Sequence, residues 1–252
     1  MKKILCKIAS VCMAFLIVTY VNSSYAYAAS TTVTSSYAYE TENGYNYYFY
    51  SYATSFDSSS IYGLVKCMSN GSGNIPIGYM GVHARLYDKN TTLITSSDWY
   101  YNQNAVAGIG ATTSFIYTSG TYYSKGEVDL YNGNSYTGYE AYGTPYLSIG
   151  GSRASLSLDA SNNIKVNKNG ETYGSELIAD TMGIKLDLIA ARGINNIFGY
   201  VRSSDLNSTK IDNPNDITPL KSKRTIPLYN EDGVAIIDSF VIDNTGIETV
   251  TN

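Results

Sequence analysis

The feature that most constrains the fold is an alternation of apolar and polar side chains in the region between residues 46 and 149. Side chains alternate across a β-strand, so a period of two predicts strands with one apolar inner face. The clearest run extends from Gly78 to Tyr87. Its inner face would hold Met80, Val82, Ala84 and Leu86. Its outer face would hold Tyr79, His83, Arg85 and Tyr87.

A second alternating run extends from Tyr122 to Tyr131 and is followed by Asn132-Gly133-Asn134, which is typical of a tight hairpin turn. Weaker strands are expected over 46–56, 60–67, 92–100, 109–118 and 136–148. The result is about seven strands spaced about ten residues apart, a pattern that favours an antiparallel sandwich or barrel. The polar face of the second run would hold Tyr123, Lys125, Glu127, Asp129 and Tyr131.

The composition changes near Gly150-Gly151, after which tyrosine becomes sparse and charged residues become common. We therefore predict an all-β chain: a Tyr-rich antiparallel β-sandwich over 46–150, then a small, mostly-β C-terminal module over 151–252. The module is expected to end in a hairpin, Thr225–Tyr229 with Val234–Ile242. Residues 29–45 are expected to form a flexible leader, 175–182 a helical turn and 203–224 a linker.

The first 28 residues have the pattern of a cleavable signal peptide. Lys2, Lys3 and Lys7 precede an apolar stretch, and Ala26-Tyr27-Ala28 matches the small-residue cleavage pattern. We therefore expect a secreted protein with no stable membrane span after cleavage. A hydrophilic tail from Asp243 to Asn252 leads us to expect that any attachment to a cell wall is non-covalent.

The charge balance argues against nucleic-acid partners. The chain has 17 basic and 21 acidic residues, and cleavage would remove three of the lysines. An acidic chain lacks the positive footprint that a phosphate backbone requires. Cys67 is the single cysteine after residue 28, so we predict no internal disulfide, and with His83 as the single histidine we predict no zinc site. No metal and no cofactor is expected, and the oligomeric state stays open.

Catalytic arrangements are weak in this sequence, and we assign no catalytic residue. Cys67 and His83 would form a dyad only if their strands brought them together. Glu127, Asp129 and Asp98 would serve glycoside cleavage only within one cleft. The run from Asp159 to Asn163 has alternating oxygen side chains, but a turn explains it better than a calcium loop.

The strongest positive feature is aromatic. The chain has 26 tyrosines, most of them before residue 147, and tyrosine combines an apolar ring with a polar tip. We expect a non-catalytic protein that binds a cell-wall glycan or a surface protein through an aromatic sheet face. The alternative interpretation is that tyrosine lines the sheet because of its β propensity alone. The candidate ligand-binding residues are Tyr79, His83, Arg85, Tyr87, Trp99, Tyr123 and Tyr131.

The C-terminal part carries four short motifs: Asn169–Gly174, Leu186–Ala191, Gly199–Leu206 and Ile226–Tyr229. Together they resemble a small module at the C-terminus of exported or membrane proteins of Gram-positive bacteria. The resemblance implies a Gram-positive envelope context but no reaction. Two other functions stay open: a secreted antagonist, bacteriocin-like or pore-forming, with 105–121 as its candidate segment, and a polysaccharide or peptidoglycan hydrolase.

Overall fold

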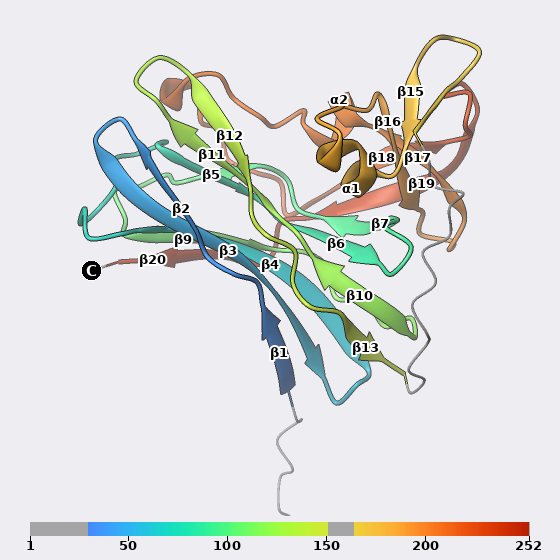
Figure 1. Ribbon diagram of the computed structural model, residues 1–252, viewed down its shortest axis with the longest axis horizontal. Helices are drawn as coiled ribbons and strands as arrows, with labels where there is room; N and C mark the ends of the chain where they lie inside the picture. The colour runs from blue at the N-terminus through green and yellow to red at the C-terminus, as the bar shows by residue number, and fades with distance from the viewer. Residues whose placement is uncertain (1–29, 151–163, 252) are drawn as a thin grey trace, which may run out of the picture.

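The computed structural model describes residues 30–150 and 164–251. They form three β-sheets and a few short helices, which confirms the predicted all-β class (Figure 1). The expected signal peptide and the Asp159–Asn163 run lie outside the described residues.

The first sheet has six strands and is built around one long strand, β3. Residues 29–45 were expected to form a flexible leader, whereas β1 and β2 occupy most of that range and pair with successive halves of β3. Threonine and tyrosine favour strands, and the length of β3 gives both strands a partner. The strands are β1 (Ser30–Thr34), β2 (Ala38–Glu42), β3 (Tyr45–Phe56), β4 (Ser60–Ser69), β9 (Gly108–Thr112) and β20 (Ile247–Val250).

The second sheet has four strands and contains the predicted hairpin. Gly133 has a φ of 100°, and Asn132 donates its backbone N–H to the Ser135 carbonyl at 3.0 Å, so the turn lies where the sequence predicts it. In sheet order the strands are β12 (Tyr136–Glu140), β11 (Glu127–Tyr131), β5 (Met80–His83) and β8 (Tyr100–Tyr101).

The third sheet has ten strands and combines both halves of the chain. The strand β7 pairs in parallel with β16 at Ala191↔Leu93 and with β19 at Ile242↔Ser96. Backbone bridges therefore join the predicted sandwich to the predicted module. In order the strands are β13 (Leu147–Ile149), β10 (Gly120–Ser124), β6 (Arg85–Asp88), β7 (Leu93–Ser96), β19 (Ile236–Asp243), β18 (Lys223–Tyr229), β17 (Phe198–Arg202), β16 (Leu188–Arg192), β15 (Thr172–Gly174) and β14 (Lys165–Val166).

Both strongly alternating runs are divided between two sheets. The run 78–87 becomes β5 and β6, and the run 122–131 becomes β10 and β11. The second division falls at Gly126, where a Cβ atom would lie 2.4 Å from the Cβ of Val65 in the opposite sheet. Only glycine allows this close approach, so the break lets both new sheets pack on β4.

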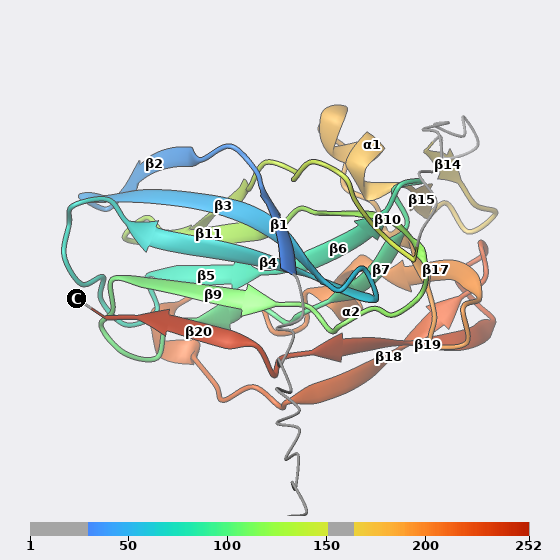
Figure 2. The ribbon, with the colours of Figure 1, turned by 90° about the horizontal axis from the view of Figure 1, so that it is seen from below.

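The six-stranded sheet packs against the layer formed by the other two. Its inward residues, such as Phe49, Val65 and Ile109, share one apolar core with Met80, Val82 and Leu130 of the four-stranded sheet. The predicted apolar face of the 78–87 run is therefore buried as expected. At the end of the chain, β20 returns from the C-terminal part to run beside β9 (Figure 2).

The C-terminal part, whose strands extend the ten-stranded sheet, also packs on Tyr87, Leu93 and Tyr123 of β6, β7 and β10. It includes the helices α1 (Glu176–Thr181) and α2 (Ser203–Leu206), the first of which matches the predicted helical turn. A second apolar core joins Tyr87, Leu93 and Tyr123 to residues of this part such as Ile189 and Phe240. The final hairpin forms as predicted from β18 and β19. Over 30–150 and 164–251, helices long and apolar enough to span a membrane are absent.

Candidate functional site

The residues predicted to form an outer binding face do not form one. Tyr79 and Tyr131 are half-buried and pack on each other with ring centroids 4.8 Å apart. His83 is 0 % exposed and Arg85 is 2 % exposed. The buried members are His83, Arg85, Tyr87, Trp99 and Tyr123.

These residues are buried because the C-terminal part covers the face that alternation assigned to solvent. Arg85 and Tyr87 both contact the carboxylate of Glu176 at the start of α1. The Trp99 indole N–H donates to the side chain of Asn207, directly after α2, at 2.8 Å. Alternation separates the two faces of a strand, but it does not tell whether a second layer covers the polar one.

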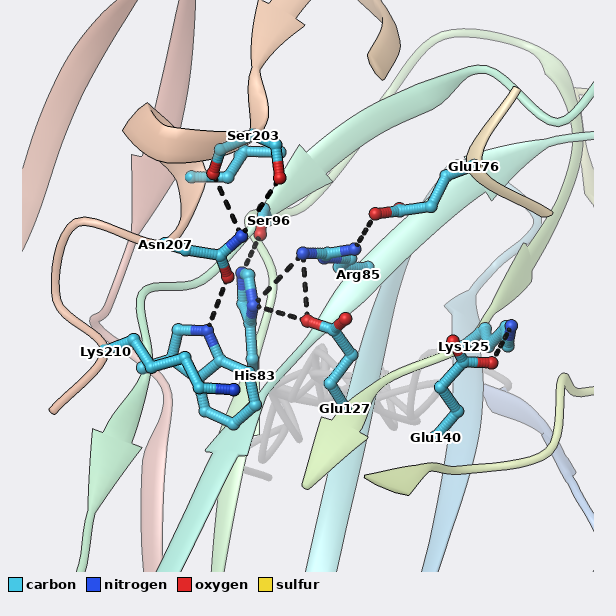
Figure 3. Close-up of polar contacts among 12 residues, drawn as sticks. His83, Arg85, Ser96, Lys125, Glu127, Glu140, Glu176, Ser203, Asn207 and Lys210 are labelled. Carbon is cyan, nitrogen blue, oxygen red and sulfur yellow. Dashed lines mark hydrogen bonds and ion pairs between the residues drawn. The ribbon is translucent and has the colours of Figure 1, made fainter. Parts of the chain in front are cut away.

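His83 is the centre of a buried polar network (Figure 3). Its Nδ1 lies 3.0 Å from Oε2 of Glu127, and its Nε2 lies 2.7 Å from Oγ of Ser96. The Trp99 ring packs on the imidazole with centroids 5.1 Å apart. Burial, followed by the charge of Arg85, lowers the pKa of His83, so the ring is neutral at pH 7.

The hydrogen bonds join the side chains of Ser96, His83 and Glu127 in the order of a nucleophile, a base and an orienting carboxylate. However, Ser96 and His83 are both 0 % exposed. The Ser96 hydroxyl also lies 2.8 Å from the Ser97 carbonyl and 3.2 Å from that of Ala84. A substrate carbonyl has no access to this hydroxyl, so the arrangement fixes strands β5 and β7 relative to each other.

Arg85 connects this network to the C-terminal part. One of its terminal nitrogens lies 2.9 Å from Glu127 of β11, and the other contacts Glu176 of α1. Burial raises the pKa of Glu127, but Arg85 and then His83 outweigh burial and lower it to about 2. A buried guanidinium between two carboxylates stabilises the joint only as long as all three charges stay together.

The other candidate groups are also held in structural contacts. Asp129 accepts hydrogen bonds from Tyr101 at 2.8 Å and from Lys210 at 2.9 Å, and burial raises its pKa. Asp98 forms an ion pair with Arg224 at 2.6 Å. Cys67 lies in the core of the sandwich, where burial raises the pKa of its thiol and disfavours the reactive thiolate.

A different group of aromatic residues is accessible, on the outer side of the six-stranded sheet. In register with Tyr48 of β3 lies Tyr39 of β2, which is 62 % exposed, and the neighbouring Tyr37 is 49 % exposed. Phe115, which follows β9, lies at the other end of this group of rings and packs on Tyr62. We call this group the aromatic face: Tyr37, Tyr39, Tyr48, Tyr50, Tyr52, Phe56, Tyr62 and Phe115.

The rings of the aromatic face form one continuous series of contacts. Tyr48 and Tyr50 are parallel within 4°, with centroids 6.3 Å apart, and Tyr50 and Tyr52 are also 6.3 Å apart. Tyr37 packs edge-on against Tyr50 at 4.8 Å. Ring–ring packing of this kind stabilises each side chain, so the row is preorganised.

The charge beside the aromatic face is neutralised. The ammonium group of Lys66, in register with Tyr50, lies 2.8 Å from the carboxylate of Glu248 and 5.9 Å from the centre of the Tyr52 ring. The surface therefore offers apolar rings, phenolic hydroxyls and a closed ion pair, a combination suited to an uncharged, hydroxyl-bearing ligand.

Period-two reasoning missed this face because β3 is aromatic on both sides. Tyr47 and Phe49 are buried in the core, whereas Tyr48 and Tyr50 point outward. When consecutive residues of a strand are all aromatic, the two faces of the strand do not differ in polarity, so alternation cannot distinguish the inner face from the outer one. The useful signal would have been the density of tyrosine itself, which exceeds what one buried face can hold.

Comparison with known proteins found no matching family model, no matching curated protein and no matching solved structure. Within the described ranges, His, Cys, Asp and Glu side chains form no cluster of three or more that could hold a metal ion. The four segments that carry the C-terminal resemblance contribute to the neighbouring strands β15, β16, β17 and β18.

Proposed function

We propose that this protein is exported and binds an uncharged glycan of the cell envelope, without catalysis, through the aromatic face. The observation that carries the proposal is the series of accessible rings from Tyr39 to Phe115 across one sheet. Exposed aromatic patches of this extent on soluble proteins mark interaction sites. The predicted signal peptide and the C-terminal resemblance support an envelope location in a Gram-positive bacterium.

A glycan suits this face better than a charged polymer. The apolar C–H face of a sugar ring packs on an aromatic ring, and tyrosine hydroxyls donate to and accept from sugar hydroxyls. Since Lys66 is already paired with Glu248, its ammonium group is not free to pair with a phosphate or carboxylate. Binding is therefore expected to depend little on salt concentration.

The test is retention of the chain from residue 29 onward on isolated peptidoglycan sacculi stripped of anionic polymers. The double variant Tyr37→Ala/Tyr39→Ala removes two exposed rings that contribute little to the core. We expect the double variant to lose about 1–2 kcal/mol of binding free energy, which would weaken retention by a factor of about 5–30. The matched control is Tyr142→Ala, which removes a tyrosine of similar exposure outside the aromatic face.

Equal retention of the double variant and the control would contradict the proposal. Protease treatment of the sacculi before the assay separates the two ligand classes. Retention that survives this treatment supports a glycan. Retention that disappears indicates a surface protein and overturns the glycan assignment.

A further inference from the structure

A pocket of about 500 Å³ lies where the two halves of the chain meet. Five segments of the described chain line it: the turn after β6, strand β7, the segment after β9 with the start of β10, the turn after β16, and β19. Its volume lies in the range of small-molecule sites, about 300–1,000 Å³. Because both halves contribute, the pocket exists only in the assembled fold.

One buried hydroxyl in the pocket wall has no partner. Thr95 of β7 is 3 % exposed, and its Oγ1 forms no hydrogen bond with any residue of 30–150 or 164–251. An unsatisfied buried polar group costs about 1–3 kcal/mol, so a partner for this hydroxyl would stabilise the protein. A rotation of the side chain that turns Oγ1 toward the pocket would let a hydroxyl of a bound molecule satisfy Thr95.

The pocket also has an excess of positive charge. Lys89 and Arg192 both line it, and neither has a carboxylate within ion-pairing distance among the described residues. Arg192 donates one hydrogen bond to the Asn196 carbonyl at 3.1 Å. Among the described residues that line the pocket, the single carboxylate is that of Asp88, which accepts from the backbone N–H groups of Asn90 and Thr92. A guanidinium without a carboxylate partner favours a ligand that carries one.

The remaining wall alternates hydroxyl groups with apolar surface. Ser119 and Thr121 contribute hydroxyls, and Ile94, Ile116 and Tyr122 contribute the apolar surface. This mixture suits a compact carbon ring that carries several hydroxyls better than it suits an acyl chain, which needs no hydroxyl partners.

We infer that this pocket binds a sugar that carries a carboxylate, with Arg192 on the carboxylate and Thr95, after a rotation of its side chain, on a ring hydroxyl. This site is separate from the aromatic face and does not rest on the proposed function. Residues Ser114 to Thr118 connect the two places: Ile116 lines the pocket, whereas Phe115 belongs to the aromatic face.

The test is calorimetric titration of the chain from residue 29 onward with glucuronic, galacturonic and N-acetylmuramic acids. Glucose and inorganic phosphate serve as comparison ligands. At least one acidic sugar is expected to bind ten times more tightly than both. If none does, the inference is overturned; equal binding of phosphate shows a general anion site and also overturns it.

Two variants assign the binding to the pocket. Arg192→Gln is expected to weaken acidic-sugar binding at least tenfold, whereas Lys165→Gln, an equal loss of charge on exposed β14, leaves it unchanged. Thr95→Val removes the unpartnered hydroxyl, so it is expected to raise the melting temperature of the free protein. The same variant is expected to weaken sugar binding several-fold. Unchanged affinity in both pocket variants would place the binding elsewhere. Retention on sacculi is expected to be unaffected in these variants, which separates this site from the aromatic face.

Discussion

The buried network around Arg85 and the aromatic face are built from similar residues but have opposite relations to solvent. In the network, Tyr87 donates its hydroxyl to Glu176, and every charge has a partner inside the protein. On the aromatic face, Tyr37 and Tyr39 present their rings outward beside a neutralised ion pair. The difference teaches that tyrosine content alone does not locate a binding surface. A tyrosine-rich face can bind a ligand only if no further layer of the protein covers it.

The largest loss of unfolding free energy is expected from a substitution of Arg85. Replacement with methionine leaves Glu127 and Glu176 as uncompensated carboxylates at a buried joint. Breaking a buried ion pair in this way costs about 3–5 kcal/mol of unfolding free energy. Urea denaturation measures the loss. The control is Lys168→Met, which breaks an exposed pair with Asp232 and should cost less than about 1 kcal/mol. Equal costs would show that the network does not hold the two halves together.

The next effect compares two tyrosine hydroxyls. Tyr87→Phe removes the hydrogen bond to Glu176 and is expected to cost about 1.5–3 kcal/mol, because the acceptor is charged and the site is buried. Tyr39→Phe removes a hydroxyl from a side chain that is 62 % exposed and is expected to change stability by less than about 0.5 kcal/mol. Thermal denaturation of the two variants tests the contrast, which fails if both shift the melting temperature equally.

The smallest effect concerns pH. The pKa of His83 is lowered in the folded protein, so below about pH 6.5 the unfolded chain binds a proton that the folded protein does not. Stability should therefore fall as the pH decreases through about 6.5, with a slope of at most about 1.4 kcal/mol per pH unit. His83→Gln should remove this dependence. The acid loss below about pH 4.5 should remain in the variant, because the lowered pKa of Glu127 causes it. Identical pH profiles above pH 5 would contradict this assignment.

The sequence predicted the strands of this protein better than their layers. The apolar face from Met80 to Leu86, the Asn132-Gly133 turn and the final hairpin all follow from local alternation and turn chemistry. The division of the second alternating run at a sheet boundary could not be predicted, because it depends on the contact between Gly126 and Val65 across the sandwich. Local patterns contain no information about that contact.

The candidate site was harder to predict for the same reason. His83 and Arg85 occupy the outer face of their strands, and only the docking of α1, far away in sequence, turns that face into an interior. Conversely, the outward rings of β3 alternate with inward rings, so no period distinguishes them. Polar residues on a strand face predict exposure only where no later segment covers them.

The most direct measurement is oxidative footprinting of tyrosine side chains, with and without sacculi, read by mass spectrometry. The account predicts that Tyr37, Tyr39 and Tyr50 become protected from oxidation on binding, whereas Tyr142 stays reactive because it lies outside the aromatic face. Protection of Tyr142 with unchanged reactivity of Tyr37 and Tyr39 would contradict the account and place the binding surface elsewhere.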